Sequence, residues 1–275
     1  MNAQGLTSIV MPCLNAEATI GEAITSVLGQ RDAAFELIVM DGGSRDGTLE
    51  RARRFGDSRL RILSAPDRGV AEALNRGFAL ARGTALCWLN ADDVYLNARA
   101  VALAARTMAS RHVESVIGHS ALLDRHGVVT RTLYTWTTNL EHSRRGANLF
   151  TGSLFFSREI WQRFGGFDVT LKVAFEYELS DFLFHSGPPV LADEVLAGLR
   201  CHAGSLSERF PERMVEELAR IRPSVPAGKP ERTHRLLAHV RDRTLGRVLL
   251  NALQDRYAGQ SWRSLFLRSA HQHLR

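Results

Sequence analysis

The chain has 275 residues, 45% of them hydrophobic, which is enough for one large domain with an appendage. Its formal net charge of +6 is unevenly distributed. Residues 205–275 contain 14 basic and 7 acidic residues, whereas residues 1–204 contain 21 basic and 22 acidic residues. The chain has three widely spaced cysteines (Cys13, Cys87 and Cys201) and no CxxC pair, which argues against a disulfide framework or a zinc cluster.

We expect neither a secretory signal nor a membrane span. The N-terminus lacks a basic segment followed by an apolar stretch, and nowhere is an apolar run long enough to cross a bilayer. Unpaired cysteines suit a reducing compartment, so the sequence predicts a cytoplasmic protein.

In the first half of the chain, short apolar runs alternate with segments whose apolar residues recur at helical spacing. The expected strands are residues 8–11, 35–40, 60–63 and 87–89. Helical patterns begin at Ile20, after Thr48 and at Val70. This alternation predicts an α/β fold with a mostly parallel central sheet and helices on both faces.

Three of the expected strands lead into polar loops that carry carboxylates, namely Asp41, Asp67 and the pair Asp92–Asp93. In a parallel sheet these loops share one edge, where open α/β sheets place their ligands. Because unpaired carboxylates repel each other, a convergent set implies a cation or hydrogen-bond donors from a ligand. Hard oxygen ligands suit Mg²⁺ or Mn²⁺ held together with the phosphates of a nucleotide. The alternative for Asp92–Asp93 is a solvated turn.

The loop after Asp41 contains Gly42-Gly43, which permits positive φ and close approach of a base or ribose to the main chain. It is not a P-loop, because no Gly-Lys-Ser/Thr follows, and it is not a GxGxxG motif. For Asp46 and Thr48, helix capping is favoured over ligand contact.

After Asp93 the pattern is less regular. Apolar spacing predicts a helix from Val101 to Met108, and short strands are expected at residues 116–118, 128–130 and 149–156. A short helix is expected to end at Gly165–Asp168, and another begins at Phe175–Leu179.

Taken in order, these motifs resemble the family 2 glycosyltransferases over residues 1–205. The motifs are Ser8–Pro12 with Asn15–Glu17, Asp41–Thr48, Pro66–Gly69 with Asn75–Gly77, and Leu89–Asp93. The resemblance implies a GT-A fold, a nucleotide-sugar donor, a divalent cation (Mn²⁺ or Mg²⁺) and inversion at the anomeric carbon. It also implies a saccharide or lipid-linked acceptor, in the synthesis of cell-surface polysaccharide.

By position, the resemblance assigns donor binding to residues in the loops after the strands. They are Pro12, Leu14, Asn15, Asp41, Gly43, Asp67, Asn75, Asn90, Ala91 and Asp92. Gly42 stands where many members have a second acid that can contact uracil, and Leu14 where many have a base-stacking Tyr. Asn90 replaces the first Asp of the family's Asp-x-Asp motif. A UDP-sugar is therefore the default donor from family frequency.

The resemblance makes Asp92 a metal ligand, with Asp93 beside it. Residues 199–205 resemble the family's Arg-x-His segment. This makes His202 a further metal ligand or a diphosphate contact, and Arg200 a counter-charge. A structural role is the alternative for His202, since imidazole suits Mn²⁺ less well than oxygen does.

Direct displacement at the anomeric carbon needs a general base that removes the proton of the acceptor hydroxyl. The family uses the Asp of a Glu-Asp-x-x-Leu pattern, and Glu176 has that position here, so we expect Glu176 to be the catalytic base. A solvated helix face is the alternative, and Glu178 is expected to pack or pair nearby. Trp161 and Trp136 could stack on a sugar ring, although core packing is the more common role of a tryptophan.

Residues 206–275 are interpreted as a basic helical C-terminal extension of a GT-A domain that spans residues 1–205. A helix is expected from Pro211 to Arg222, followed by a breaker-rich linker at 223–230 and basic amphipathic patterns. These helices would either pack on the catalytic domain or lie on an anionic membrane surface. Peripheral attachment at the inner face of the plasma membrane would suit a lipid-linked acceptor. No nucleic-acid motif accompanies the charge.

Two other functions stay open at this point. A nucleotidyltransferase on a related sheet would need a basic loop near the N-terminus, yet Arg31 is the only Lys or Arg before Arg45. A non-catalytic nucleotide-binding protein is the second alternative, because Asn90 and Gly42 depart from the catalytic pattern.

Overall fold

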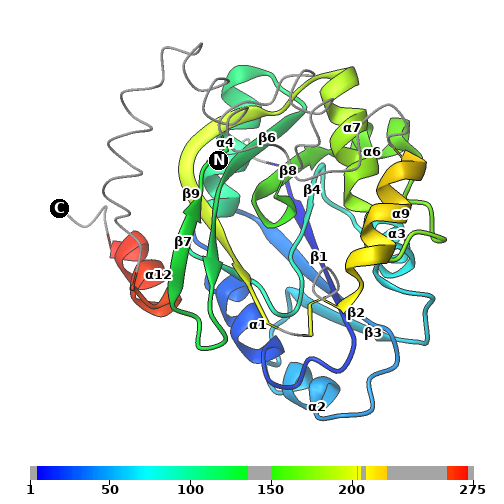
Figure 1. Cartoon of the computed structure of the whole chain (residues 1–275). Coiled ribbons are helices and arrows are strands. Elements are labelled where there is room, and N and C mark those ends of the chain that lie inside the picture. Colours follow the sequence, from blue (N-terminus) through cyan, green and yellow to red (C-terminus); the bar gives the residue numbers. More distant parts are fainter. Residues whose placement is uncertain (1–4, 136–149, 203, 206–208, 222–258, 272–275) are drawn as a thin grey trace.

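The computed structural model describes residues 5–135, 150–202, 204–205, 209–221 and 259–271. They form a nine-stranded sheet with helices on both of its faces (Figure 1). The strands lie in the order β3-β2-β1-β4-β8-β6-β9-β5, and β7 pairs with β6 outside this path.

The four strands of the N-terminal half run parallel, as the sequence predicts. They are β1 (Thr7–Cys13), β2 (Phe35–Asp41), β3 (Leu60–Ser64) and β4 (Ala85–Trp88). The helices between them are α1 (Ile20–Leu28), α2 (Thr48–Arg53) and α3 (Val70–Leu80). Cys13 pairs with Asp41, and Asp41 pairs with Ser64, so three strands end in register at one edge of the sheet.

The second half adds strands of both directions. Its elements are β5 (Val94–Tyr95), α4 (Ala100–Arg111), β6 (Ser115–Leu123), β7 (Val129–Leu133), η1 (Thr151–Ser153), β8 (Leu154–Ser157), α6 (Arg158–Phe164), α7 (Glu176–Ser186) and β9 (Val190–Arg200). Strand β8 is antiparallel to β4 and β6, whereas β9 is parallel to β6 and antiparallel to β5. The predicted α/β architecture is confirmed. Its parallel part is the N-terminal half, whose strands lead into the loops of Asp41 and Asp67.

Several details differ from the sequence predictions, and two of them concern strands of the second half. The strand expected over residues 149–156 begins only at Leu154, because Thr151–Ser153 form a 3₁₀ turn; residue 149 lies outside the described part. Strand β9 was not predicted, because the exposed acids Asp193 and Glu194 interrupt its apolar pattern.

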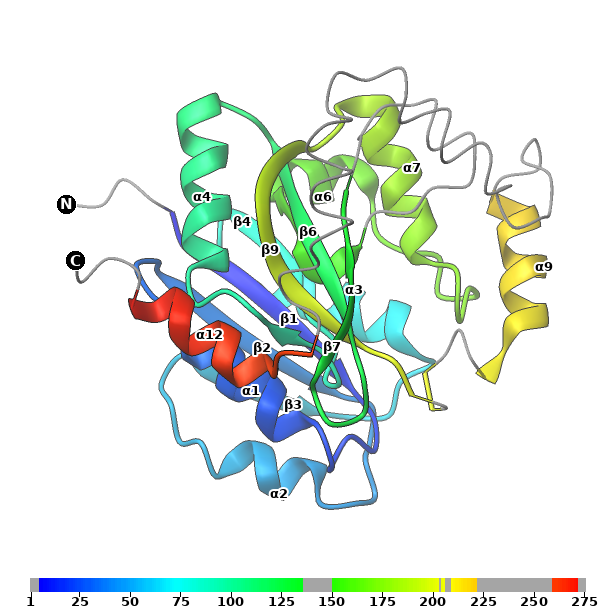
Figure 2. The ribbon, with the colours of Figure 1, turned by 60° about the vertical axis from the view of Figure 1, so that its left-hand side comes forward.

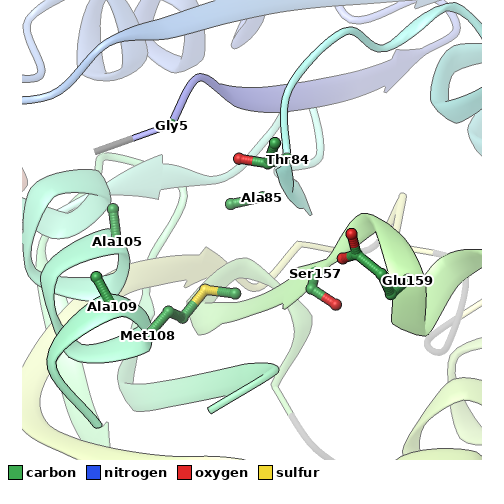
Figure 3. A pocket seen from close by; sticks show the side chains of 8 residues that line it. All are labelled: Gly5, Thr84, Ala85, Ala105, Met108, Ala109, Ser157 and Glu159. Atoms are coloured by element: carbon green, nitrogen blue, oxygen red, sulfur yellow. The ribbon is translucent and has the colours of Figure 1, made fainter. Parts of the chain in front are cut away.

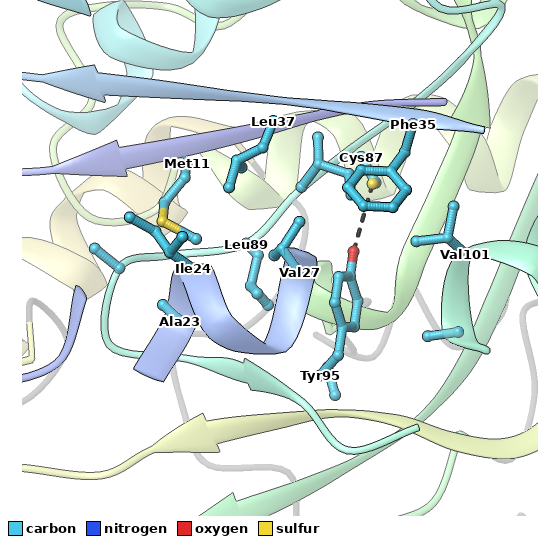
Figure 4. Packing of buried hydrophobic residues seen from close by; sticks show 14 of the residues in the cluster. Met11, Ala23, Ile24, Val27, Phe35, Leu37, Cys87, Leu89, Tyr95 and Val101 are labelled. Atoms are coloured by element: carbon cyan, nitrogen blue, oxygen red, sulfur yellow. Dashed lines mark hydrogen bonds between the residues drawn. The ribbon is translucent and has the colours of Figure 1, made fainter. Parts of the chain in front are cut away.

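Alternate residues of the parallel strands face opposite sides of the sheet, and both sides are apolar. Ile9 and Met11 of β1 pack with α1 and α4, while Val10 packs in a second cluster with α3, α6 and α7. Figure 4 shows the first cluster, in which the Cys87 thiol lies 3.5 Å from the Tyr95 hydroxyl. Because both faces are covered, the carboxyl ends of these strands form a rigid edge on which a site can be built.

Two helices of the C-terminal extension are described, and they lie on opposite sides of the body (Figures 1 and 2). Helix α9 (Pro211–Ile221) lies beside α7, and α12 (Trp262–His271) buries Trp262 and Leu265 against β5, β6, β7 and β9. The predicted linker and the helical pattern that follows it, residues 223–249, are outside the described residues. The boundary at residue 205 remains a prediction. Among the described helices, none combines the length and the apolar character that a bilayer span requires.

Gly77 allows α3 to approach the sheet closely, and this generates a stability prediction. A Cβ at Gly77 would lie 2.4 Å from Cγ1 of Val10 and 3.0 Å from Cγ of Met40. We expect Gly77→Ala to lower the free energy of unfolding by about 1–3 kcal/mol, because overpacked cores must shift, as measured by urea unfolding. The matched control is Gly21→Ala on α1, where a Cβ would meet nothing within 4 Å. It should be neutral or stabilise by up to about 1 kcal/mol, and equal losses in both variants would contradict the packing argument.

Candidate active site

Asp41 ends β2 and is surrounded by hydrogen-bond donors. It is 2% exposed, and it accepts hydrogen bonds from the backbone N–H groups of Gly43 and Ser44 (3.2 Å each) and from the hydroxyl of Ser64 (2.6 Å). Burial by itself would raise the pKa of Asp41, but these hydrogen bonds outweigh it and lower the pKa. Asp41 is therefore an ionised carboxylate around which the loop after β2 is wrapped.

Asp67 lies against the same loop. A Cβ at Gly42 would lie 2.7 Å from Oδ2 of Asp67, while Oδ1 accepts the N–H of Gly69 at 2.8 Å. Burial raises the pKa of Asp67 against the effect of this hydrogen bond, and the charges of Glu72 and Asp41 raise it further. The glycine at position 42 thus leaves the room that the Asp67 carboxylate occupies.

Asn15 joins the loop after β1 to the loop after β2. Its N–H donates to Oγ of Ser44 (2.8 Å), and its Oδ1 accepts the N–H of Arg45 (2.9 Å). The neighbouring Leu14 is 58% exposed, so its apolar side chain is open to a ligand, whereas Pro12 is buried within β1. Leu14 and Asn15 therefore lie at the edge where donor binding was expected.

Asn75 is used differently from the expectation. Its Oδ1 accepts the N–H of Phe167 and its Nδ2 donates to the carbonyl of Phe167, both at 2.9 Å. Both ends of the amide therefore join α3 to the segment after α6. This geometry favours a structural role over direct contact with a donor.

Asp92 and His202 meet although 110 residues separate them. Oδ2 of Asp92 lies 2.9 Å from Nε2 of His202, and the two side chains are 30% and 34% exposed. Nδ1 of His202 accepts the N–H of Gly204 at 3.1 Å, so Nε2 carries the proton and donates to Asp92 when the imidazole is neutral. In the described part of the chain, no group of three or more His, Cys, Asp and Glu side chains could enclose a metal ion.

Asp93 and Arg200 hold the loop that carries Asp92. Asp93 is 5% exposed and accepts hydrogen bonds from Nδ2 of Asn90 (3.1 Å) and from the backbone N–H of Arg200 (2.9 Å). The guanidinium of Arg200 donates to the carbonyl of Asp92 (2.9 Å), to a carbonyl of the β6–β7 turn (3.0 Å) and to Glu22 (2.8 Å). Its side chain is only 4% exposed. Arg200 thus binds protein acceptors, which does not fit the expected role of a counter-charge to a diphosphate.

Glu176 is the first residue of α7 and lies within electrostatic range of this loop. Burial, the charge of Asp92 and the charge of Glu176 all raise the pKa of Asp93 well above its usual value. Glu178, two residues later, accepts the N–H of Asp168 at 3.0 Å, so it pairs within its own segment. Of these two acids, Glu176 is the one whose charge acts on Asp93, whereas Glu178 accepts a hydrogen bond from the segment before α7.

Trp161 belongs to an aromatic cluster rather than to this edge. Its ring centroid lies 4.5 Å from that of Phe78, 5.6 Å from that of Phe164 and 5.4 Å from that of Phe167. This is the core-packing alternative, and it does not support stacking on a sugar. Trp136 lies outside the described residues.

A hollow of ≈ 240 Å³ lies at the other end of β4 (Figure 3). Thr84 and Ala85 line it at the start of that strand, with Met108 of α4 and Glu159 of α6. Asp92 instead follows the end of β4, so this hollow is separate from the edge that carries the acids.

The model of the family described as Glycosyl transferase family 2 matches residues 8–161, more than half of the chain. The chain belongs to this family. The matched range includes Asp41, Asp67 and Asp92. Membership makes the protein a glycosyltransferase and sets aside the nucleotidyltransferase and non-catalytic alternatives.

This glycosyltransferase is similar to curated relatives from bacteria. The PGL/p-HBAD biosynthesis glycosyltransferase of Mycobacterium tuberculosis is 30% identical over 183 residues, which are 65% of this chain and 69% of the relative. The UDP-Glc:alpha-D-GlcNAc-diphosphoundecaprenol beta-1,3-glucosyltransferase WfgD of Escherichia coli is 33% identical over 125 residues. That match covers 45% of this chain and 49% of WfgD.

Solved structures show the fold. The structure of Staphylococcus aureus TarS (residues 1–349) with UDP-GlcNAc has a TM-score of 0.66 at 18% identity, covering 83% of this chain and 68% of TarS. The mannosyltransferase PcManGT of Pyrobaculum calidifontis, solved with GDP-Man and Mn²⁺, has a TM-score of 0.55 at 18% identity and covers 79% of this chain and 63% of PcManGT. The predicted GT-A fold is thereby confirmed.

The burial of Arg200 generates a second stability prediction. We expect Arg200→Leu to lower the free energy of unfolding by about 3–5 kcal/mol, because the carbonyl groups and the carboxylate that it binds lose a buried charged donor. The control is Arg263→Leu, which removes an arginine bound to the same Glu22 at 3.1 Å but with a side chain that is 69% exposed. That variant should stay within about 1 kcal/mol of the wild type in urea unfolding. A comparable loss in both would contradict the role assigned to Arg200.

The cysteines give a prediction about thiol reactivity. Cys201 is exposed, whereas burial raises the pKa of Cys13 and raises that of Cys87 to about 12. Because the thiolate is the reactive form, we expect a disulfide reagent such as DTNB to titrate one thiol per native chain at neutral pH and three after denaturation. Cys201→Ser should abolish the native reaction. A second rapidly reacting thiol in the native protein would show that the parallel strands are less tightly covered than described.

Proposed function

We propose that this glycosyltransferase moves a sugar from a nucleotide-sugar donor, by default a UDP-sugar, to a saccharide or lipid-linked acceptor with inversion at the anomeric carbon. The observation that supports it is the arrangement of Asp41 and Asp92 after β2 and β4, the two strands that flank β1. Two strand spacings correspond to about 10 Å, a span that a nucleoside diphosphate can bridge. Glu176, whose charge acts on Asp93, would then serve the Asp92 side of the site, where the sugar would be.

The names of the relatives support the donor and acceptor classes. The name of WfgD specifies UDP-Glc and a diphosphoundecaprenol-linked acceptor, and TarS was solved with UDP-GlcNAc. PcManGT was solved with GDP-Man, so the uridine base is a default within this proposal. The exposed Leu14 would offer an apolar surface to the base, and the ionised Asp41 would accept hydrogen bonds from the nucleoside.

Some of the side chains at this site suit a divalent cation as metal ligands. Oδ2 of Asp92 is partly exposed and is a hard oxygen ligand, and Mg²⁺ or Mn²⁺ often takes one or two protein carboxylates and completes its shell with phosphate oxygens and water. His202 could add Nε2 only if the proton on that nitrogen left and the hydrogen bond from Gly204 to Nδ1 were released. When bound, the cation would neutralise charge that develops on the leaving diphosphate. Asp92 is therefore the principal metal ligand in this proposal.

The remaining chemistry belongs to Glu176. Its carboxylate would accept the proton of the acceptor hydroxyl while that oxygen attacks the anomeric carbon from the face opposite the diphosphate. Glutamate is one methylene longer than the aspartate that the family has at this position, so the backbone that carries it must lie slightly further from the acceptor. No other side chain of α7 is needed for this step.

In this proposal the extension, residues 206–275, attaches the enzyme to the membrane that holds the lipid-linked acceptor. In α12 the exposed residues include Arg263, Leu267 and Arg268, a mixture of basic and apolar side chains suited to an anionic surface. Peripheral contact with the cytoplasmic face of a membrane would bring a lipid-linked acceptor to the enzyme.

The proposal is tested by turnover of a panel of nucleotide-sugars with an undecaprenyl-diphosphate-sugar acceptor. We expect activity that EDTA abolishes and Mn²⁺ or Mg²⁺ restores. Glu176→Gln should lower kcat by about 10²–10⁴-fold while donor binding by calorimetry is retained, because only proton transfer is lost. Asp92→Asn should raise the metal concentration needed for half-maximal rate.

The control is Glu159→Gln, which makes the same chemical change at an exposed acid beside the hollow at the other end of β4. It should leave all rates unchanged. Unaltered turnover in both the Glu176 and the Asp92 variants would refute the assigned site, and retention of the anomeric configuration in the product would refute direct displacement.

A further inference from the structure

Helix α9 docks on the body through a buried glutamate. Glu217 is the one buried residue of this eleven-residue helix and is 3% exposed, whereas Val215 on the same helix is 52% exposed. Amphipathic helices normally bury apolar side chains, and a carboxylate is almost never fully buried unless it is paired. The burial of Glu217 therefore requires specific partners.

Those partners are three consecutive backbone N–H groups. The carboxylate of Glu217 accepts from the N–H of Lys172 (2.9 and 3.0 Å), of Val173 (2.9 Å) and of Ala174 (3.0 Å). Nε of Arg213, one turn earlier on α9, donates to Oε1 at 2.7 Å and balances the charge. Burial alone would raise the pKa of Glu217, but these hydrogen bonds lower it to about 2, so the group is ionised at neutral pH.

The three N–H groups immediately precede α7. The first N–H groups inside α7 have local partners, because the N–H of Tyr177 donates to the carbonyl of Ala174 (3.0 Å) and that of Glu178 to the carbonyl of Phe175 (3.1 Å). Glu217 instead anchors the three residues that lead into α7. Glu176, the first residue of the helix, lies two positions after the last of them.

The same segment contacts the donor side of the site. Nζ of Lys172 donates to the carbonyl of Arg68 (2.6 Å), next to Asp67, and to the carbonyl of Val169 (2.9 Å). The segment before α7 is thus held at one end by the loop of Asp67 and at the other by Glu217. Its position sets where Glu176 lies relative to a bound donor.

We propose that Glu217 is a positioning residue for glycosyl transfer: its carboxylate fixes the segment Lys172–Ala174 that leads into α7 and so holds the Glu176 side chain where it can reach the acceptor hydroxyl. This inference rests on the proposed function of Glu176 as the general base. It makes α9 part of the catalytic apparatus although no residue of α9 is assigned a contact with substrate.

The test compares Glu217→Gln and Glu217→Asp with the wild type in the full-length chain. In Glu217→Gln the side chain loses its charge, and its amide NH₂ group faces backbone N–H groups with which it cannot form hydrogen bonds. In Glu217→Asp the charge remains, but the shorter side chain cannot reach the N–H groups of all three residues. We expect kcat to fall about 10–100-fold for Glu217→Gln and less for Glu217→Asp, because small displacements of a reacting group are costly. The dissociation constant for UDP, measured by calorimetry, should change by less than about twofold, since Lys172, Val173 and Ala174 are not assigned to nucleotide binding.

A second readout does not depend on activity. Hydrogen exchange of the amides of Lys172, Val173 and Ala174 should be protected in the wild type and markedly faster in Glu217→Gln. The matched control is Glu216→Gln, which changes the adjacent, exposed carboxylate of the same helix and should alter neither exchange nor kcat.

The outcomes separate this inference from the proposed function. Protected amides and an unchanged kcat in Glu217→Gln would overturn the positioning role, as would parallel losses of UDP affinity and kcat, which indicate general destabilisation. Faster exchange with a lower kcat supports it. If Glu176→Gln keeps full activity, the assignment of the base fails. A lower kcat with unchanged UDP affinity in Glu217→Gln would then mean that the contacts of Glu217 act through a group other than Glu176, and the inference as stated would be refuted.

Discussion

Asp41, Asp67 and Asp93, three of the four acids at this edge of the sheet, are held by backbone N–H groups, and the rest of the site depends on that interaction. Asp41 accepts two such groups from its own loop, Asp67 accepts one from Gly69, and Asp93 accepts the N–H of Arg200. A backbone donor fixes a carboxylate and offsets its charge without placing a cationic side chain in the site. Several acids can therefore lie close together while space for a ligand remains between them.

The two halves of the site are joined by contacts between segments that are remote in sequence. Strands β1 to β4 supply the loops of Asp41 and Asp67, whereas Asp92 is held by Arg200, the last residue of β9, and by His202, which follows that strand. Asn75 ties α3 to the segment after α6, and Lys172 ties the start of α7 to the loop of Asp67. A donor bound to the first half would thus lie at a defined distance from Glu176 in the second.

The positions of the acids in the first half could be predicted from the sequence because the signal is local. Asp41 directly follows an apolar run, and Asp92 follows another within four residues, so the strand pattern alone placed them at one edge. Arg200 could not be predicted in this way. Its environment depends on Glu22, which is 178 residues distant, and on Asp93, which is 107 residues distant, so the local sequence could not show that the counter-charge predicted at Arg200 is buried and bound to protein acceptors.

The role of Glu217 could not be predicted from the sequence for a related reason. A glutamate in a helix rich in charged residues is typical of a solvated face, and nothing in its neighbourhood shows that three N–H groups, more than forty residues earlier, lack partners of their own. The start of α7 gives no local signal either. Helices α1, α2, α3 and α4 also begin without a side-chain cap, so the lack of one at α7 does not point to a remote carboxylate.

The two described helices of the extension contact the body through different kinds of interaction, and this difference bears on the role of the extension. Helix α12 docks through Trp262 and Leu265, as an appendage stabilised by apolar burial would, and leaves basic side chains such as Arg263 at the surface. Helix α9 packs Ile221 against the core only partly, and its one buried side chain is the ionised carboxylate of Glu217, whose partners lie in the segment that leads into α7. A buried charge contributes little net stability compared with an apolar contact of the same size, so stability alone does not account for Glu217. A carboxylate does, however, fix the orientation of the N–H groups that it accepts, and orientation is what a general base at the start of α7 requires.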